Sequence, residues 1–235
     1  MNLILISEDD FTGPNCVQLQ GRRCRHVVHV LRASAGDHLH IGLLNGPAGT
    51  GRVTAVSPDT VTLELHLNRR PPDPLPVTLI LALPRPKVLK RVLIAAASMG
   101  VKEIVLLNAF RVEKSFWQSP LLDRERIDEY LTLGLEQARD TVMPKALLRP
   151  LFKPFVEDEL PQLIEGSSAF IAHPDAKDNC PRAVAGKVTL AIGPEGGFIP
   201  YEIEKLLSAG FHPVSLGCRP LRVETVVPAL LSRLF

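Results

Sequence analysis

The sequence predicts an α/β protein in two parts: a strand-rich module over residues 1–70 and a larger domain of alternating strands and helices over residues 77–235. Closely spaced apolar and alternating segments in the first part are typical of a small β-barrel. Strands that alternate with helices in the second part favour a mostly parallel sheet covered on both faces. A run of prolines makes residues 71–76 a stiff linker between the two parts.

The first part holds strand patterns at residues 3–6, 17–20, 38–43, 51–56 and 60–65. The segment GPAGTG at 46–51 lies between two of these strands. It has glycines in the order GxxGxG and no helix after it, so we expect a hairpin loop rather than a nucleotide-binding loop.

A basic segment over residues 22–32 predicts a short helix that ends near Gly36 and Asp37. Its cations favour contact with RNA phosphates, because no acid lies among them to neutralise their charge. The alternative is a solvated helix face with Val27, Val30 and Leu31 packed inward. The candidate phosphate-binding residues are Arg22, Arg23, Arg25 and Arg32.

The second part begins with a buried strand over 77–83 and a helix over 87–99. Lys87, Lys90 and Arg91 share one face of that helix, which makes a second candidate RNA surface. Further strands are expected at 103–107, 146–148, 169–172, 188–192 and 213–216, and further helices at 124–139, from 200, and at 224–231.

Aromatic side chains lie beside cations in the loop 110–117. This combination suits unpaired bases, although Phe116 and Trp117 could equally anchor the loop on the core.

Composition limits the classes of function. A net charge of +2 is too small to indicate nucleic-acid binding by itself. The 4 cysteines form no Cys-x-x-Cys pair and have no histidines at zinc spacing, so no structural metal or disulfide framework is expected. The amino-terminal segment MNLILISEDD lacks the pattern of a signal peptide, and no apolar run is long enough to cross a membrane. A cytoplasmic protein is therefore expected.

Two turns near the carboxyl terminus favour a ligand site. The buried strand ending at Ile192 runs into Gly193-Pro194-Glu195-Gly196-Gly197, where glycine allows close approach of the main chain to a ligand. The second turn, residues 216–222, also follows a short apolar strand and leads into a helix. A tight connection without a ligand would explain the first turn alone, but it does not explain two such turns.

The segments IGPEGGF and LGCRPLRVET resemble the GPEGG and LGxRxLRxET signatures of the bacterial 16S ribosomal RNA N3-uridine methyltransferases (RsmE-type), a branch of the SPOUT superfamily. Residues 26–37 are similar to the family's HxxxVLR…GD element. The resemblance implies a PUA-like β-barrel followed by a SPOUT-type α/β domain with a C-terminal trefoil knot. The chain departs from the family's usual residues at Ser98, Arg139, Pro220 and Val226, which weakens the match for the substrate more than for the cofactor.

The resemblance also implies S-adenosyl-L-methionine as the cofactor and N3 of a 16S rRNA uridine as the acceptor. The family holds its cofactor among three loops, which here follow Ala172, Ile192 and Leu216. The matching cofactor-binding residues are His173, Ile192, Gly193, Pro194, Gly196, Leu216, Gly217, Leu221, Arg222 and Thr225.

Methylation at N3 sets chemical requirements of its own. The imide proton must leave before or during attack, and positive charge is needed near the uracil oxygens. Arg222 is the preferred anion-stabilising residue, and Arg111 matches an arginine of the family. Glu195 or Glu224 could accept the proton, although Glu224 could equally cap a helix.

The resemblance implies a homodimer acting on an assembled small ribosomal subunit. The apolar helix near the carboxyl terminus suits a dimer interface or a buried core equally. Two alternatives stay open: a SPOUT enzyme acting on another position, such as a ribose 2′-hydroxyl of rRNA or tRNA, and a ribosome-assembly protein that binds RNA without catalysis.

Overall fold

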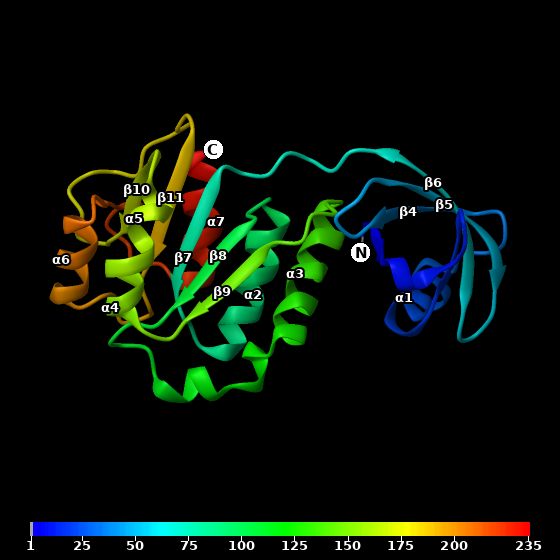
Figure 1. Ribbon diagram of the computed structural model, residues 1–235, viewed down its shortest axis with the longest axis horizontal. Coiled ribbons are helices and arrows are strands. Elements are labelled where there is room, and N and C mark those ends of the chain that lie inside the picture. Colours follow the sequence, from blue (N-terminus) through cyan, green and yellow to red (C-terminus); the bar gives the residue numbers. More distant parts are fainter. Residues whose placement is uncertain (1) are drawn as a thin grey trace. The chain divides into compact units, whose positions relative to one another are not determined.

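The computed structural model describes residues 2–235, which group into two compact units (Figure 1). The first unit comprises the chain up to Asp73 together with Thr132–Met143, and the second comprises Pro74–Leu131 and Pro144–Phe235. The boundary between Asp73 and Pro74 lies inside the linker expected at 71–76.

Residues 77–235 were predicted to form one domain, whereas Thr132–Met143 groups with the first unit. Main-chain hydrogen bonds account for this grouping: the N–H of Leu3 donates to the carbonyl of Glu136 over 3.0 Å, and that of Asn45 donates to the carbonyl of Thr141 over 2.7 Å. Periodicity could not indicate this division, because the helix that contains Glu136 continues across it.

The first unit is built on one mostly antiparallel sheet with strand order β1-β4-β5-β6-β3-β2. Only β1 and β4 pair in parallel. The described pairing does not join β1 to β2, so closure into a barrel stays a prediction. The strands are β1 (Ile4–Ile6), β2 (Phe11–Gly13), β3 (Cys16–Leu19), β4 (His38–Leu43), β5 (Ala48–Val56) and β6 (Val61–Arg69).

The core of the first unit follows the alternation of its strands. Val61, Leu63 and Leu65 of β6 are buried, while the residues between them face outward. The segment predicted as one helix consists of α1 (Gly21–Arg25) and a turn of π-helix, η2 (His26–Leu31), whose Cys24 and Val27 join the same core. A single-turn 3-10 helix, η1 (Glu8–Asp10), precedes β2.

The second unit contains a six-stranded sheet, all parallel, in the order β12-β10-β11-β7-β8-β9. Leu79, Ile80 and Leu81 of β7 are fully buried, as expected for a central strand with both faces covered. The strands are β7 (Val77–Ala82), β8 (Glu103–Leu107), β9 (Lys145–Arg149), β10 (Ser167–Ala172), β11 (Lys187–Ile192) and β12 (His212–Val214).

Helices cover this sheet on its two faces. Figure 1 shows α7 behind the sheet and α5 in front of it; α7 packs beside α2, and α5 contacts β10 and β11. The helices that lie wholly or partly in this unit are α2 (Pro86–Ser98), α3 (Arg124–Ala138), α4 (Phe152–Pro154), α5 (Leu160–Ile164), α6 (Pro200–Ser208) and α7 (Val223–Leu234). Short 3-10 and π segments complete it: η3 (Lys114–Gln118), η4 (Pro120–Leu122) and η5 (Phe155–Glu159).

The loop between β10 and β11 is hydrogen-bonded to two points of the carboxyl-terminal segment, Ser215 and Arg233. The N–H of Ser215 donates to the carbonyl of Asp178 over 2.9 Å, and the Arg233 Nε donates to the carbonyl of Cys180 over 2.6 Å. These contacts join the segments that the predicted trefoil knot would thread past each other. The knot itself stays a prediction.

Among the described residues, no helix has the length and apolar character needed to cross a membrane.

Candidate active site

A cavity of about 770 Å³ lies at the carboxyl ends of β7, β10, β11 and β12. Ligands of open parallel sheets bind at this edge, near the point where the strand order reverses. Here the order reverses beside β7, because β8 and β9 continue on one side of it and β10 to β12 lie on the other. The lining is formed by Arg85, Val88, Arg111, residues 172–175, 192–198, 214–217 and 219–224, Val226 and Leu230.

The first motif turn is folded tightly against the end of β11. The N–H of Gly197 donates to the carbonyl of Pro194 over 2.7 Å, and Gly197 has a φ of 73°, which favours glycine. A Cβ on Gly193 would lie 3.1 Å from the Phe198 ring and 3.2 Å from the Phe198 nitrogen. Glycine therefore lets the turn close and leaves main chain, rather than side chains, facing the cavity.

Two arginines from other loops hold this turn. The main-chain N–H of Arg85, after β7, donates to the Glu195 Oε1 over 3.3 Å. The Arg111 guanidinium, after β8, donates to the carbonyl of Gly196. The turn is thus held from the ends of β7 and β8, and Glu195 and Arg111 both line the cavity as predicted.

The second motif turn leads into α7. Gly217 has a φ of 112°, and Arg222 is the N-cap residue of α7. Glu224 lies in the first turn of α7, and its Oε1 is 3.8 Å from the Arg91 Nη1. Both Arg222 and Glu224 line the cavity. The position of Glu224 fits the capping alternative, because a carboxylate at a helix N-terminus is stabilised by the helix dipole.

The structure brings together nearly all the predicted cofactor residues. His173 lines the cavity at the end of β10, where its Nδ1 accepts a hydrogen bond from the Asp175 N–H over 3.2 Å. Thr225 is the exception: it is exposed and lies outside the lining. Its main-chain N–H donates to the Arg222 carbonyl over 2.9 Å, as expected in the first turn of a helix.

Several lining residues were not predicted as site residues. Arg85 and Val88 follow β7, and Leu230 is a buried residue of α7. The position of Arg85 after a central strand was the available signal, since strand ends at this edge carry ligand residues. Phe198 and Leu230 carry no such signal, because their apolar side chains are equally expected in a core.

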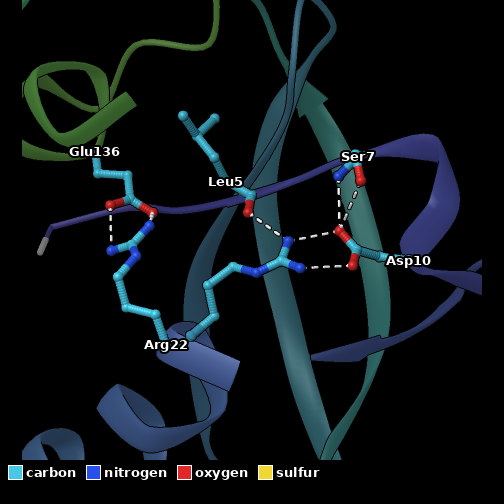
Figure 2. Close-up of polar contacts among 6 residues, drawn as sticks. Leu5, Ser7, Asp10, Arg22 and Glu136 are labelled. Carbon is cyan, nitrogen blue, oxygen red and sulfur yellow. Dashed lines mark hydrogen bonds and ion pairs between the residues drawn. The ribbon is translucent and has the colours of Figure 1, made fainter. Parts of the chain in front are cut away.

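The predicted RNA residues fall into two groups. Arg22 and Arg23 are paired with acids of the first unit, as Figure 2 shows for the labelled Arg22 and Glu136. Arg22 donates to both oxygens of Glu136 over 2.8 and 2.9 Å. Arg23 donates to both oxygens of Asp10 over 2.6 and 2.7 Å, and also to the Leu5 carbonyl. Acids from distant parts of the sequence therefore neutralise Arg22 and Arg23, although no acid lies within the segment itself.

The remaining predicted RNA residues lie at the surface. Arg25, Arg32 and Lys87 are exposed. On α2, Arg91 faces Glu224, and the Lys90 ammonium lies 5.3 Å from the centre of the Tyr130 ring. These positions leave the exposed cations accessible to phosphates.

Two titratable groups of the first unit are perturbed by their surroundings. Burial opposes ionisation of Asp10, but hydrogen bonds from Arg23 and Ser7 and the charge of Arg23 outweigh it, so the pKa of Asp10 is lowered. Burial lowers the pKa of His26, whose Nε2 is buried and has no hydrogen-bond partner among the described atoms.

The described residues contain no group of three or more histidine, cysteine, aspartate or glutamate side chains placed to hold a metal ion.

Comparison with known proteins identifies the family. Residues 71–235 match the family model described as RNA methyltransferase domain. Over 97% of this chain and 88% of the relative, the sequence is 30% identical to ribosomal RNA small subunit methyltransferase E of Treponema pallidum. The chain belongs to the ribosomal RNA small subunit methyltransferase E family. A Synechocystis family member is 27% identical over 93% of this chain and 72% of its own length.

Solved structures share the fold of this family. The Neisseria gonorrhoeae ribosomal RNA small subunit methyltransferase E, bound to S-adenosyl methionine, has a TM-score of 0.74 at 21% identity and covers 98% of this chain and 95% of its own. A Legionella pneumophila methyltransferase in complex with the same cofactor has a TM-score of 0.76 at 24% identity, covering 98% and 95%. The family model and the Treponema pallidum relative confirm the family predicted from IGPEGGF and LGCRPLRVET.

Proposed function

We propose that this chain transfers a methyl group from S-adenosylmethionine to N3 of a uridine in 16S ribosomal RNA. The observation that carries the proposal is the convergence of both motif turns, with the loop after β10, on one cavity at the carboxyl edge of the parallel sheet. Membership of a family whose relatives are named as small-subunit rRNA methyltransferases supports the class of acceptor.

The cavity fits the proposed cofactor. Its volume of about 770 Å³ lies in the range of small-molecule sites. Apolar residues such as Val88, Ile192 and Leu230 line it together with the glycine turns. When bound, S-adenosylmethionine supplies a methyl group already activated by its sulfonium, so the residues need to align and stabilise rather than form a covalent intermediate.

Two arginines at the cavity are proposed to stabilise the uracil anion. Arg222 lines the cavity, and in this proposal its guanidinium holds the negative charge that develops on the uracil oxygens as the N3 proton leaves. Arg111 adds a second cation at the same edge while it fixes the Gly196 carbonyl.

Glu195 is our candidate for the proton acceptor. It is exposed at the cavity, and a main-chain N–H positions one of its oxygens. It can therefore pass a proton to water. Glu224, by contrast, already has the cation Arg91 and a helix N-terminus beside it. Its role in this proposal is to fix α7.

The substrate is proposed to be rRNA within the small ribosomal subunit, acted on by a cytoplasmic homodimer without a metal. Reaching N3 requires extrusion of the base from its stack. The exposed cations Arg25, Arg32 and Lys87 offer phosphate contacts that would offset the cost of extrusion.

Calorimetric titration with S-adenosylmethionine and with its demethylated product tests the cofactor assignment. We expect one site per chain, and loss of binding in Gly196→Val, because a Cβ there already lies 3.1 Å from the Arg111 Cδ. Gly13→Val is the matched control, since the nearest atom to a Cβ at Gly13, a position in the first unit, is 3.8 Å away. Absence of binding by wild type would contradict the proposal and favour an RNA-binding protein without catalysis.

A further inference from the structure

Phe110 is the most exposed large apolar side chain among the described residues, with 77% of its surface accessible. It lies in a turn after β8, in which the N–H of Val112 donates to the Ala109 carbonyl over 3.0 Å. Ala109 and Val112 are buried, so the two ends of the turn are anchored in the core. The two central residues, Phe110 and Arg111, are exposed at its tip.

A buried carboxylate fixes the tip of this turn. The N–H of Phe110 donates to the Glu202 Oε1 over 2.7 Å, and the N–H of Ile199 donates to the Glu202 Oε2 over 3.0 Å. Glu202 is only 3% exposed. One side chain of α6 thus holds both the Phe110 turn and its own helix start, which follows the first motif turn.

The same turn is bound to the cofactor cavity through Arg111. The Arg111 guanidinium donates to the Gly196 carbonyl and lines the cavity. Phe110 is therefore the sequence neighbour of a cavity residue, Arg111, in a turn whose two ends are buried. An exposed ring next to a cation, on a backbone fixed by hydrogen bonds, is an arrangement suited to binding unstacked bases.

We propose that Phe110 is the surface on which the acceptor base stacks, and that Glu202 is the positioning residue that sets this ring. The inference rests on the proposed function and names the residue that recognises its substrate. The other aromatics of the loop are less suited: Phe116 and Trp117 are half-buried, and the Trp117 Nε1 donates to the Asn108 Oδ1 over 2.9 Å. They anchor the loop and leave base contact to Phe110.

The test is steady-state methyl transfer from radiolabelled S-adenosylmethionine to small ribosomal subunits from a strain lacking the modification. Phe110→Ala should lower kcat/KM for subunits about 10- to 100-fold, the effect of removing one base-stacking contact. Phe110→Trp should retain activity. Phe110→Leu should not, because it restores apolar surface without a ring face. Affinity for S-adenosylmethionine, measured by calorimetry, should stay within about twofold of wild type in all three, since Phe110 is not in the cavity lining.

Two further variants separate stacking from other roles. Leu207→Ala, a change at a 40% exposed apolar residue near the end of α6, should leave transfer unchanged. Glu202→Gln should raise KM for subunits while folding, followed by circular dichroism, is retained, because an amide can still accept at one of the two N–H groups. A purely structural Glu202 would alter thermal stability without changing KM.

The outcomes are distinct. Wild type that transfers no methyl group removes the proposed function and this inference with it. Active wild type with an equally active Phe110→Ala, or with Phe110→Leu as active as Phe110→Trp, removes this inference alone. Conversion of a dimer to a monomer by Phe110→Ala, seen by sedimentation, would also overturn it, because the ring would then belong to a subunit interface.

Discussion

At the scale of the residue, Gly217 lines the cavity in a backbone conformation that favours glycine. Its φ of 112° is in the region that side chains disfavour, and nothing lies within 4 Å of an added Cβ. Gly210, after α6, has a φ of 104° and the same open space, but it lies outside the lining. We expect Gly217→Ala and Gly210→Ala each to cost about 1–2 kcal/mol of folding free energy. Only Gly217→Ala should weaken S-adenosylmethionine binding, measured by calorimetry. Equal affinities in the two variants would show that the turn at Gly217 does not contact the cofactor.

Arg222 carries the proposed charge stabilisation at the acceptor. Removing a group that stabilises developing negative charge lowers turnover about 100-fold or more. Arg222→Ala should therefore lose turnover while its affinity for S-adenosylmethionine is retained. Arg219→Ala is the matched control, because Arg219 is also an exposed arginine of the same turn and lines the same cavity. A near-normal rate for Arg222→Ala, or equal losses in both variants, would assign the chemistry elsewhere.

Asp10 gives the first unit a defined response to acid. Its folded pKa is lowered below 3.8, because hydrogen bonds and charge from Arg23 outweigh the effect of burial. A lowered carboxyl pKa adds stability above the unfolded pKa, and this stability is lost as pH falls through the folded value. Asp10→Asn should be less stable than wild type to urea at pH 6, and the difference should shrink as pH falls toward 3. Asp9→Asn, at an exposed neighbour, should follow wild type; a difference for Asp10→Asn that does not change with pH would exclude the ionised pair as its cause.

At the scale of the element, the Arg22–Glu136 pair ties α1 to the end of α3 within the first unit. Glu136 has a side chain only 2% exposed, whereas Arg22 is 43% exposed. Arg22→Ala leaves a buried carboxylate without this partner, so we expect a loss of about 1–3 kcal/mol in urea unfolding, less than for a fully buried pair. Arg25→Ala should change stability little, since Arg25 is exposed.

This pair also changes how RNA binding must be tested. Reversing the charge of Arg22 and Arg23 would disrupt their carboxylate partners as well as any phosphate contact. Arg25 and Arg32 are the better probes of RNA binding.

An Arg22→Ala protein as stable as wild type would show that the Arg22–Glu136 pair contributes little to holding α1.

Most elements were predictable because their signals are local. The alternation of Val61, Leu63 and Leu65 predicted β6, and the apolar run before Gly193 predicted β11. The strand β2 and the helices between Phe152 and Ile164 were missed, since they are short and their sequences lack a clear period. The loop expected at 46–51 is shorter, because β5 already begins at Ala48.

At the scale of the whole molecule, the sequence motifs predicted which turns form the candidate site. They did not predict the residues from distant parts of the chain that contact those turns. Both turns predicted from sequence line one cavity, as expected for strand ends of a parallel sheet. Arg85, which holds Glu195, and Glu202, which holds the Phe110 turn, act across large sequence separations. The acids that neutralise Arg22 and Arg23 were missed for the same reason. Such partners depend on tertiary structure, which local pattern does not contain.

Nucleoside analysis of rRNA tests whether this protein methylates N3 of a uridine. Small subunits from a strain lacking the modification would be incubated with this protein and S-adenosylmethionine, and the digested 16S rRNA examined by mass spectrometry against nucleoside standards. We expect 3-methyluridine at one uridine, and none when Arg222→Ala replaces the wild-type protein. A 2′-O-methylated nucleoside, or no methylated product from a protein that binds the cofactor, would contradict this expectation.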